Sequence, residues 1–155
     1  MRIIAVAVLL TVFAAALASA QAPQMSPEER QAILNYQLTL PRADQLMTAM
    51  TAMTKYVMAR PDFQERLAKS MKMTGAERRA QVENDPQAMA ILKQNSLTAQ
   101  DYLTGVPTLR MALLAAQGMT APSIVASPAN LTFAKANLAQ LKPKMDAADG
   151  VTARR

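Results

Sequence analysis

The methionines are the side chains whose type and spacing come nearest to a chemical site. The chain holds 12 of them and no cysteine or histidine. Met47, Met50 and Met53 recur at every third residue, and a single lysine separates Met71 from Met73. Thioether sulfur is a soft ligand that prefers Cu(I) to harder cations. These five residues are therefore candidate ligands for Cu(I) or Ag(I).

Helix geometry allows a second interpretation of the same residues. Met47, Met50 and Met53 would fan across about 120° of a helix and about 9 Å of its axis, so all three cannot meet one ion without help from another helix. Aliphatic residues share their stripe, within an arc of about 140°. We therefore favour a core-facing stripe in which methionine fills space, with an adaptable binding surface as the alternative. Its members are Ala43, Leu46, Met47, Met50, Met53, Val57 and Met58.

Other catalytic chemistry lacks its usual side chains. Without histidine or cysteine, the commonest general base, zinc ligands and thiolate nucleophile are missing from the sequence. Its four glycines are scattered, which does not fit a phosphate-binding loop. Three carboxylate pairs stand where helix caps or exposed turns favour acid: Glu28/Glu29, Asp62/Glu65 and Glu83/Asp85. We expect a protein that is not an enzyme and carries no cofactor.

The net charge of +6 is concentrated in one stretch of the chain. Residues 55–79 hold seven lysines and arginines against three acids. Arg66, Lys69 and Lys72 are spaced to share one helix face, which makes them candidates for contact with an anionic surface. A solvated, partly neutralised face is the simpler interpretation and the favoured one. Few aromatic residues interleave with these charges, so we do not expect nucleic acid as a partner.

The first 20 residues are typical of a secretory signal peptide. Arg2 precedes an apolar run over residues 3–17, and Ala18-Ser19-Ala20 matches the small-x-small pattern before a cleavage site. The run is shorter than the roughly 20 residues that span a bilayer. We expect cleavage between Ala20 and Gln21, with the mature chain periplasmic or secreted and not an integral membrane protein.

Helix start signals recur after the expected leader. Ser26 to Glu29 and Thr74 to Glu77 are capping boxes, the first with proline at the first helical position. Asp85-Pro86, Thr98 to Asp101 and Ser127-Pro128 give three further starts. Proline and glycine then set the expected ends. The helices expected from these signals cover residues 26–38, 41–61 and 62–73. Two more begin at residues 74 and 85. The last two cover 98–118, with a kink or break at Gly105 and Pro107, and a segment from 128 that frays between Pro143 and Gly150.

No segment shows the sustained alternation of a β-strand. We therefore predict an all-α protein, a compact bundle of about five to seven short helices. The expected organisation is a signal peptide over 1–20, a loose lead-in over 21–25, a helical domain over 26–148 and a disordered tail over 149–155.

Three short segments carry a resemblance. Tyr36 to Pro41, Ser96 to Tyr102 and Asn130 to Phe133 are similar to recurring pieces of uncharacterised exported helical proteins from bacteria. The resemblance covers most of the chain after the leader, although its motifs are low in information. It implies a helical fold and export, and it assigns no functional residue.

Several functions remain open on this evidence. The favoured hypothesis is a non-enzymatic binding or structural module of the cell envelope. A chaperone-like holdase and a methionine-based Cu(I) or Ag(I) carrier are the alternatives. The partner is undetermined; an envelope protein, an anionic envelope polymer and a small hydrophobic ligand are each compatible with the sequence.

Overall fold

The computed structural model describes residues 25–149, and the expected signal peptide, its cleavage site at Ala20 and Gln21, most of the lead-in and residues 150–155 lie outside this range. The described chain is all-α, as predicted, and contains no strand within that range. Its seven helices agree with the expected number. They are α2 (Pro27–Asn35), α3 (Leu40–Met58), α4 (Phe63–Ser70), α5 (Gly75–Glu83), α6 (Pro86–Gln94), α7 (Ala99–Ala116) and α8 (Pro128–Ala148).

The helix starts follow the capping signals closely. Ser26 with Glu29, Thr74 with Glu77 and Thr98 with Asp101 form reciprocal capping boxes in which each side chain accepts a backbone N–H of the other residue. Asp85 caps α6 and Ser127 caps α8, each followed by proline. These caps satisfy backbone donors that the first turn of a helix leaves without partners. Local sequence therefore determines where most helices begin.

The helix ends depart from the predictions because distant residues decide them. The first helix ends at Asn35 rather than near Leu38, since the buried Asn130 side chain holds the extended backbone that follows. Its Oδ1 accepts from the Leu38 N–H at 3.0 Å, and its Nδ2 donates to the Tyr36 carbonyl at 2.6 Å. Neither contact can be read from local periodicity.

Proline has less effect inside α7 and α8 than expected. The segment over 98–118 is not two helices, because α7 runs unbroken through Gly105 and Pro107. Fraying from Pro143 is also wrong: α8 passes it and continues to Ala148, where Met145 and Ala148 are buried. Burial of this last turn compensates for the hydrogen bond that proline cannot make. Asp149, predicted to begin the tail, caps α8 and pairs with Arg110 at 2.5 Å.

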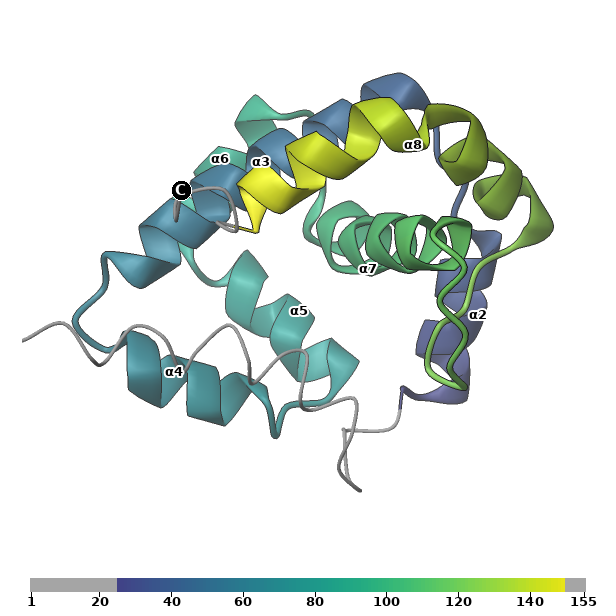
Figure 1. Ribbon diagram of the computed structural model, residues 1–155. Coiled ribbons are helices and arrows are strands. Elements are labelled where there is room, and N and C mark those ends of the chain that lie inside the picture. The colour runs from purple at the N-terminus through teal and green to yellow at the C-terminus, as the bar shows by residue number, and fades with distance from the viewer. Residues whose placement is uncertain (1–24, 150–155) are drawn as a thin grey trace, which may run out of the picture.

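The core lies between α3, α6, α7 and α8. Figure 1 shows α8 lying along α3 and passing over α7, with α2 at the far side. Met47, Met50 and Met53 face this core and are 4–8% exposed, which confirms the packing interpretation. Met58 is 59% exposed, so its assignment to the stripe is wrong; it is the last residue of α3, where the helix leaves the core.

Two helices stand at the margin of the bundle. Figure 1 shows α4 at the lower edge, with α5 between it and the rest of the molecule. Neither α4 nor α5 has a buried residue. Within residues 25–149, no helix has the length and hydrophobicity needed to cross a bilayer.

Candidate anionic-surface contact site

The middle of the basic stretch is α4 with its connecting turns, residues 59–74, called the α4 arm below. A helix of eight residues is marginally stable in water on its own. Asp62 precedes α4, where a negative charge favours the helix dipole, and Lys69 lies in the last turn, where a positive charge does. Charge placement therefore supports a helix whose side chains are at most partly buried.

Asp62 joins two arginines of the arm, one before α4 and one within it. Its Oδ1 accepts from Arg60 Nε at 3.0 Å, and its Oδ2 accepts from Arg66 Nε at 2.7 Å. Its carboxylate makes no capping hydrogen bond to α4. The hydrogen bonds from Arg60, and then those from Arg66, hold the pKa of Asp62 well below its ordinary value. The same contact with Asp62 raises the pKa of Arg60.

A second carboxylate, Asp85, joins this cluster to the bundle. The Tyr56 hydroxyl lies 2.9 Å from both Asp85 oxygens, and Arg60 Nη1 lies 3.5 Å from Oδ2. Burial raises the pKa of Asp85, but the hydrogen bonds from the Ala88 N–H and the Tyr56 hydroxyl outweigh this effect, so its pKa is lowered. Because Tyr56 is on α3 and Asp85 caps α6, the α4 arm is tied to two core helices through polar contacts.

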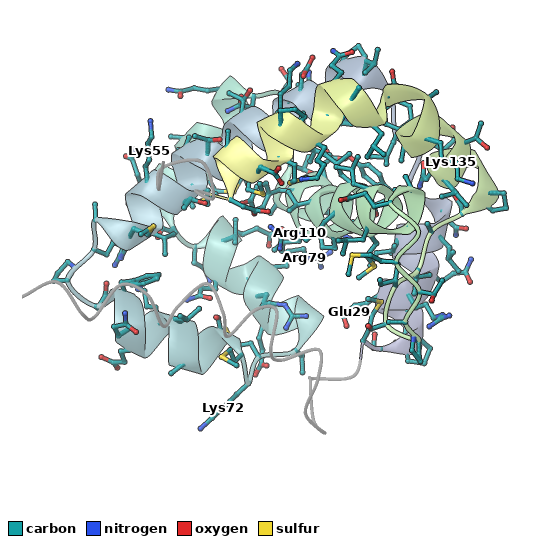
Figure 2. All side chains as sticks on the ribbon, viewed as in Figure 1. Glu29, Lys55, Lys72, Arg79, Arg110 and Lys135 are labelled. Carbon is teal, nitrogen blue, oxygen red and sulfur yellow. The ribbon has the colours of Figure 1, made fainter. Side chains whose placement is uncertain are left out.

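The three predicted basic residues differ in availability. Arg66 is engaged with Asp62 and lies 3.9 Å from Asp85. Lys69 and Lys72 are exposed, and neither forms an ion pair with another residue of the range 25–149. Lys72 lies beyond the end of α4, so the prediction that all three share one helix face is wrong for it. In Figure 2 the Lys72 side chain points away from the body of the protein.

An apolar face lies on the same arm. Phe63 and Leu67 are one helical turn apart, which places them on one side of α4. Both are only partly buried, and neither belongs to the set of hydrophobic residues that pack against the core. Met71, just after the helix, is 49% exposed. The α4 arm therefore exposes Met71 beside its lysines and keeps Phe63 and Leu67 partly covered.

The candidate metal ligands lie in different surroundings. Met47, Met50 and Met53 are in the core, where the Met50 sulfur lies 3.8 Å from Arg110 Nη2. Met71 and Met73 flank Lys72 in the turn between α4 and α5. Histidine, cysteine, aspartate and glutamate form no group of three suited to a metal ion within the described range.

The carboxylates considered for acid–base chemistry have structural contacts. Glu29 caps α2 and its Oε1 accepts from Arg78 Nη2, while Glu83 pairs with Arg79 at 3.7 Å. Asp62 and Asp85 belong to the cluster at the base of the α4 arm. Each predicted pair thus has at least one member held by a cap or an arginine.

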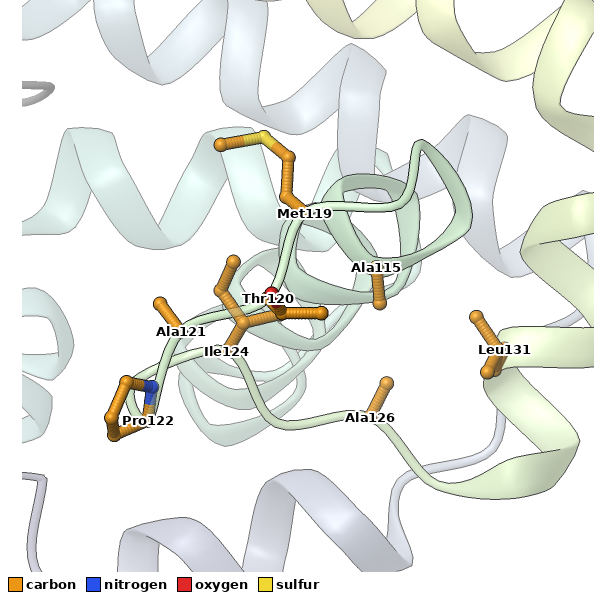
Figure 3. Close-up of a pocket in the computed structure, with 8 residues that line it drawn as sticks. All are labelled: Ala115, Met119, Thr120, Ala121, Pro122, Ile124, Ala126 and Leu131. Atoms are coloured by element: carbon orange, nitrogen blue, oxygen red, sulfur yellow. The ribbon is translucent and has the colours of Figure 1, made fainter.

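Sequence reasoning missed two hollows on the surface. The larger, of about 570 Å³, lies between the end of α7, the following loop and the start of α8 (Figure 3). A smaller hollow of about 260 Å³ lies between α2 and α7. The larger is lined by Ala115, Met119, Thr120, Ala121, Pro122, Ile124, Ala126 and Leu131. The loop predicted over 119–126 forms one wall of this hollow, but no local sequence pattern predicts the hollow itself.

The three segments that carry the sequence resemblance lie close together. Asn130 contacts the backbone of Tyr36 and Leu38, and Tyr36 lines the smaller hollow beside Asp101. The segments therefore form one corner where α2, α7 and α8 meet. The buried Asn130 side chain holds this corner together, because it bonds to the backbone of Tyr36 and Leu38.

The comparisons with known proteins add no functional residue. No protein-family model, no curated protein and no solved structure matches this chain. Its function must therefore be argued from its own residues.

Proposed function

We propose that this protein is exported and acts by contact, binding an anionic component of the cell envelope through the α4 arm and catalysing no reaction. The observation that carries the proposal is the pair of exposed lysines, Lys69 and Lys72, on an arm without buried residues. The surrounding stretch, residues 55–79, supplies most of the net positive charge of the chain. Such a surface attracts anions without a preformed pocket.

The structural roles of the other candidates support this choice. Met47, Met50 and Met53 fill the core, and at least one carboxylate of each predicted pair caps a helix or pairs with an arginine. Neither set is arranged around a shared open site. Surface contact is the function that uses Lys69 and Lys72, which are exposed and form no ion pair within the described range.

A charge-reversal experiment tests the proposed contact. Lys69→Glu/Lys72→Glu should weaken binding to dextran sulfate beads roughly tenfold or more at low salt, an effect that screening reduces as salt rises. Lys93→Glu/Lys135→Glu is the matched control, since both lysines are exposed, lie on α6 and α8, and form no ion pair within the described range. Equal binding by the two double variants would show that net charge, not the arm, drives attachment.

Export has its own test in a bacterial host. The full chain should appear outside the cytoplasm with Gln21 as its first residue. Ala20→Tyr places a bulky side chain before the expected cut and should accumulate uncleaved precursor. N-terminal sequencing reads both outcomes, and a full-length chain retained in the cytosol contradicts the proposal.

A second candidate function rests on the hollow between α7 and α8. Its lining is mostly apolar, and Met119 at its edge is 46% exposed and flexible enough to adapt. A small apolar molecule is the ligand class that fits this lining. Quenching of a Met119→Trp variant by a fluorescent fatty acid analogue, with no quenching of Lys69→Trp, would favour it.

A further inference from the structure

We infer that Met58, Met71 and Met119, called the surface methionines below, are sites of oxidation by peroxides, and that they consume peroxide before it reaches the methionines of the core. The inference goes beyond the proposed contact, because it needs neither the lysines of the α4 arm nor an anionic partner. It assigns a chemical role to methionines that the core does not use.

The first argument is which large hydrophobic side chains the fold leaves exposed. Within residues 25–149 these are Met58, Met71 and Met119, and all of them are methionine. Every leucine, isoleucine, valine and phenylalanine of that range is buried or partly buried. A reagent dissolved in the surrounding water therefore meets the exposed large apolar side chains of this range as thioethers.

The second argument is the composition of the chain. Cysteine and methionine sulfur are the usual targets of peroxide in proteins. The sequence has 12 methionines and no cysteine, and it also has no histidine and no tryptophan. Peroxide that reacts with this chain therefore reacts at thioether sulfur.

The oxidation step needs only the thioether and the peroxide. A lone pair of the sulfur attacks one oxygen of hydrogen peroxide, and the O–O bond breaks as the S–O bond forms. The other oxygen takes up the proton of the transferred hydroxyl and leaves as water. Sulfur loses two electrons, the peroxide gains them, and the product is methionine sulfoxide.

Burial determines what this product does to the fold. Met47, Met50 and Met53 face the core and are almost fully buried. A sulfoxide there would place a polar oxygen among apolar side chains, which destabilises the packing. The surface methionines belong neither to the core cluster nor to the hydrophobic residues packed against it. Their oxidation should therefore leave the helices in place.

The surface methionines are spread over the molecule. Met58 is the last residue of α3 and Met71 follows α4, so the two lie on either side of that helix. Met119 lies on the loop after α7, at the edge of the larger hollow (Figure 3) and on the side of the molecule away from α4 (Figure 1). An exposed thioether is thus present at both ends of the described chain's fold.

Peptide mapping by mass spectrometry tests the order of oxidation. The full processed chain is incubated with hydrogen peroxide, and sulfoxide is measured at each methionine over time. The surface methionines should react at least about tenfold faster than Met47, Met50 and Met53, since a buried sulfur reacts only after local opening. Circular dichroism should show an unchanged helical fold at that stage. Equal rates at the surface and in the core would overturn the inference.

A limiting dose of peroxide tests the protection of the core. The amount supplied equals that of the surface methionines and is allowed to react to completion. The surface variant is Met58→Leu/Met71→Leu/Met119→Leu, in which leucine keeps the apolar volume. The control variant is Met25→Leu/Met89→Leu/Met111→Leu, which removes the same number of partly buried methionines. Circular dichroism before treatment checks that both variants fold.

The surface variant should carry at least about twofold more sulfoxide at Met47, Met50 and Met53 than the wild type, because the faster sites have been removed. It should also lose more of its helical signal after treatment. The control variant should match the wild type in both measurements. Equal core oxidation in the wild type and the surface variant, or an equal rise in the control variant, would overturn the protective role.

Discussion

Asn130 joins two distant parts of the described chain through one buried side chain. It is 2% exposed, and both ends of its amide bond to backbone groups more than 90 residues away. A buried polar side chain must keep its hydrogen bonds, because an unpaired buried backbone group costs about 1–3 kcal/mol.

Replacing Asn130 tests this role. Asn130→Ala leaves the Leu38 N–H and Tyr36 carbonyl without partners, so we expect a loss of about 2–4 kcal/mol in the free energy of unfolding. Urea denaturation measures it. Asn137→Ala is the control, since Asn137 bonds only within α8. A loss below that of the control would mean that water replaces the side chain at little cost.

Gly105 is required by close packing rather than by backbone conformation. A Cβ at this position would lie 2.7 Å from the Tyr36 hydroxyl and 2.8 Å from the Leu46 methyl groups. Overpacking of this kind costs about 1–3 kcal/mol, which exceeds the gain of about 1 kcal/mol in helix propensity.

We therefore expect Gly105→Ala to destabilise the protein by about 1 kcal/mol in thermal or urea denaturation. Tyr36→Phe should partly rescue it by removing the nearest atom. That hydroxyl is buried without a hydrogen-bond partner in the described chain, so Tyr36→Phe alone should cost little. A Gly105→Ala protein that is more stable than the wild type would show that the Leu46 side chain moves aside at little cost, which would contradict this expectation.

At the scale of the helices, the sequence predicts beginnings better than ends. Ser26, Thr74, Asp85, Thr98 and Ser127 cap helices as their local patterns indicate. Ends depend on partners far along the chain, as Asn130 does for α2 and the core does for the last turn of α8. The methionine stripe was predictable because helical periodicity alone places it.

The candidate site was predictable only in part, for the same reason. Spacing identified Arg66, Lys69 and Lys72, but it placed Lys72 on a helix that ends at Ser70. The contact between Tyr56 and Asp85 joins residues 29 apart, and no local pattern signals it. Nor does sequence indicate that Arg66 is engaged while Lys69 is free of ion pairs within the described range.

The attachment of the α4 arm should weaken in acid. The folded pKa values of Asp62 and Asp85 lie below the ordinary value of 3.8. Their contribution to stability is therefore present above about pH 4 and is lost as pH falls through the folded values. Because the chain has no histidine, side chains of ordinary pKa add little change between about pH 5 and 8.

Denaturation of the wild type and of Asp62→Asn/Asp85→Asn checks this expectation. The wild type should lose stability between about pH 5 and pH 2 by more than the variant, on the order of the acid dependence of carboxylates in general. Asp146→Asn is a suitable control because its ion pair with Lys142 is local to α8. Parallel pH curves for wild type and double variant would contradict the assigned role.

The whole molecule divides its residues between a packed core and a cationic edge. Many methionines and leucines of α3, α6, α7 and α8 are buried together, while the α4 arm has exposed lysines and no buried residue. The proposed envelope contact assigns that exposed edge a partner of opposite charge. Attachment of this kind depends on ionic strength, so it should weaken as salt is raised.

Hydrogen–deuterium exchange with and without dextran sulfate tests the location of this contact most directly. Peptides covering residues 63–73 should exchange more slowly when dextran sulfate is present, and peptides from α8 should not change. Lys69→Glu/Lys72→Glu should abolish the protection, and Lys93→Glu/Lys135→Glu should keep it. Protection at α8 or at the hollow beside Met119, with none on the α4 arm, would contradict the account.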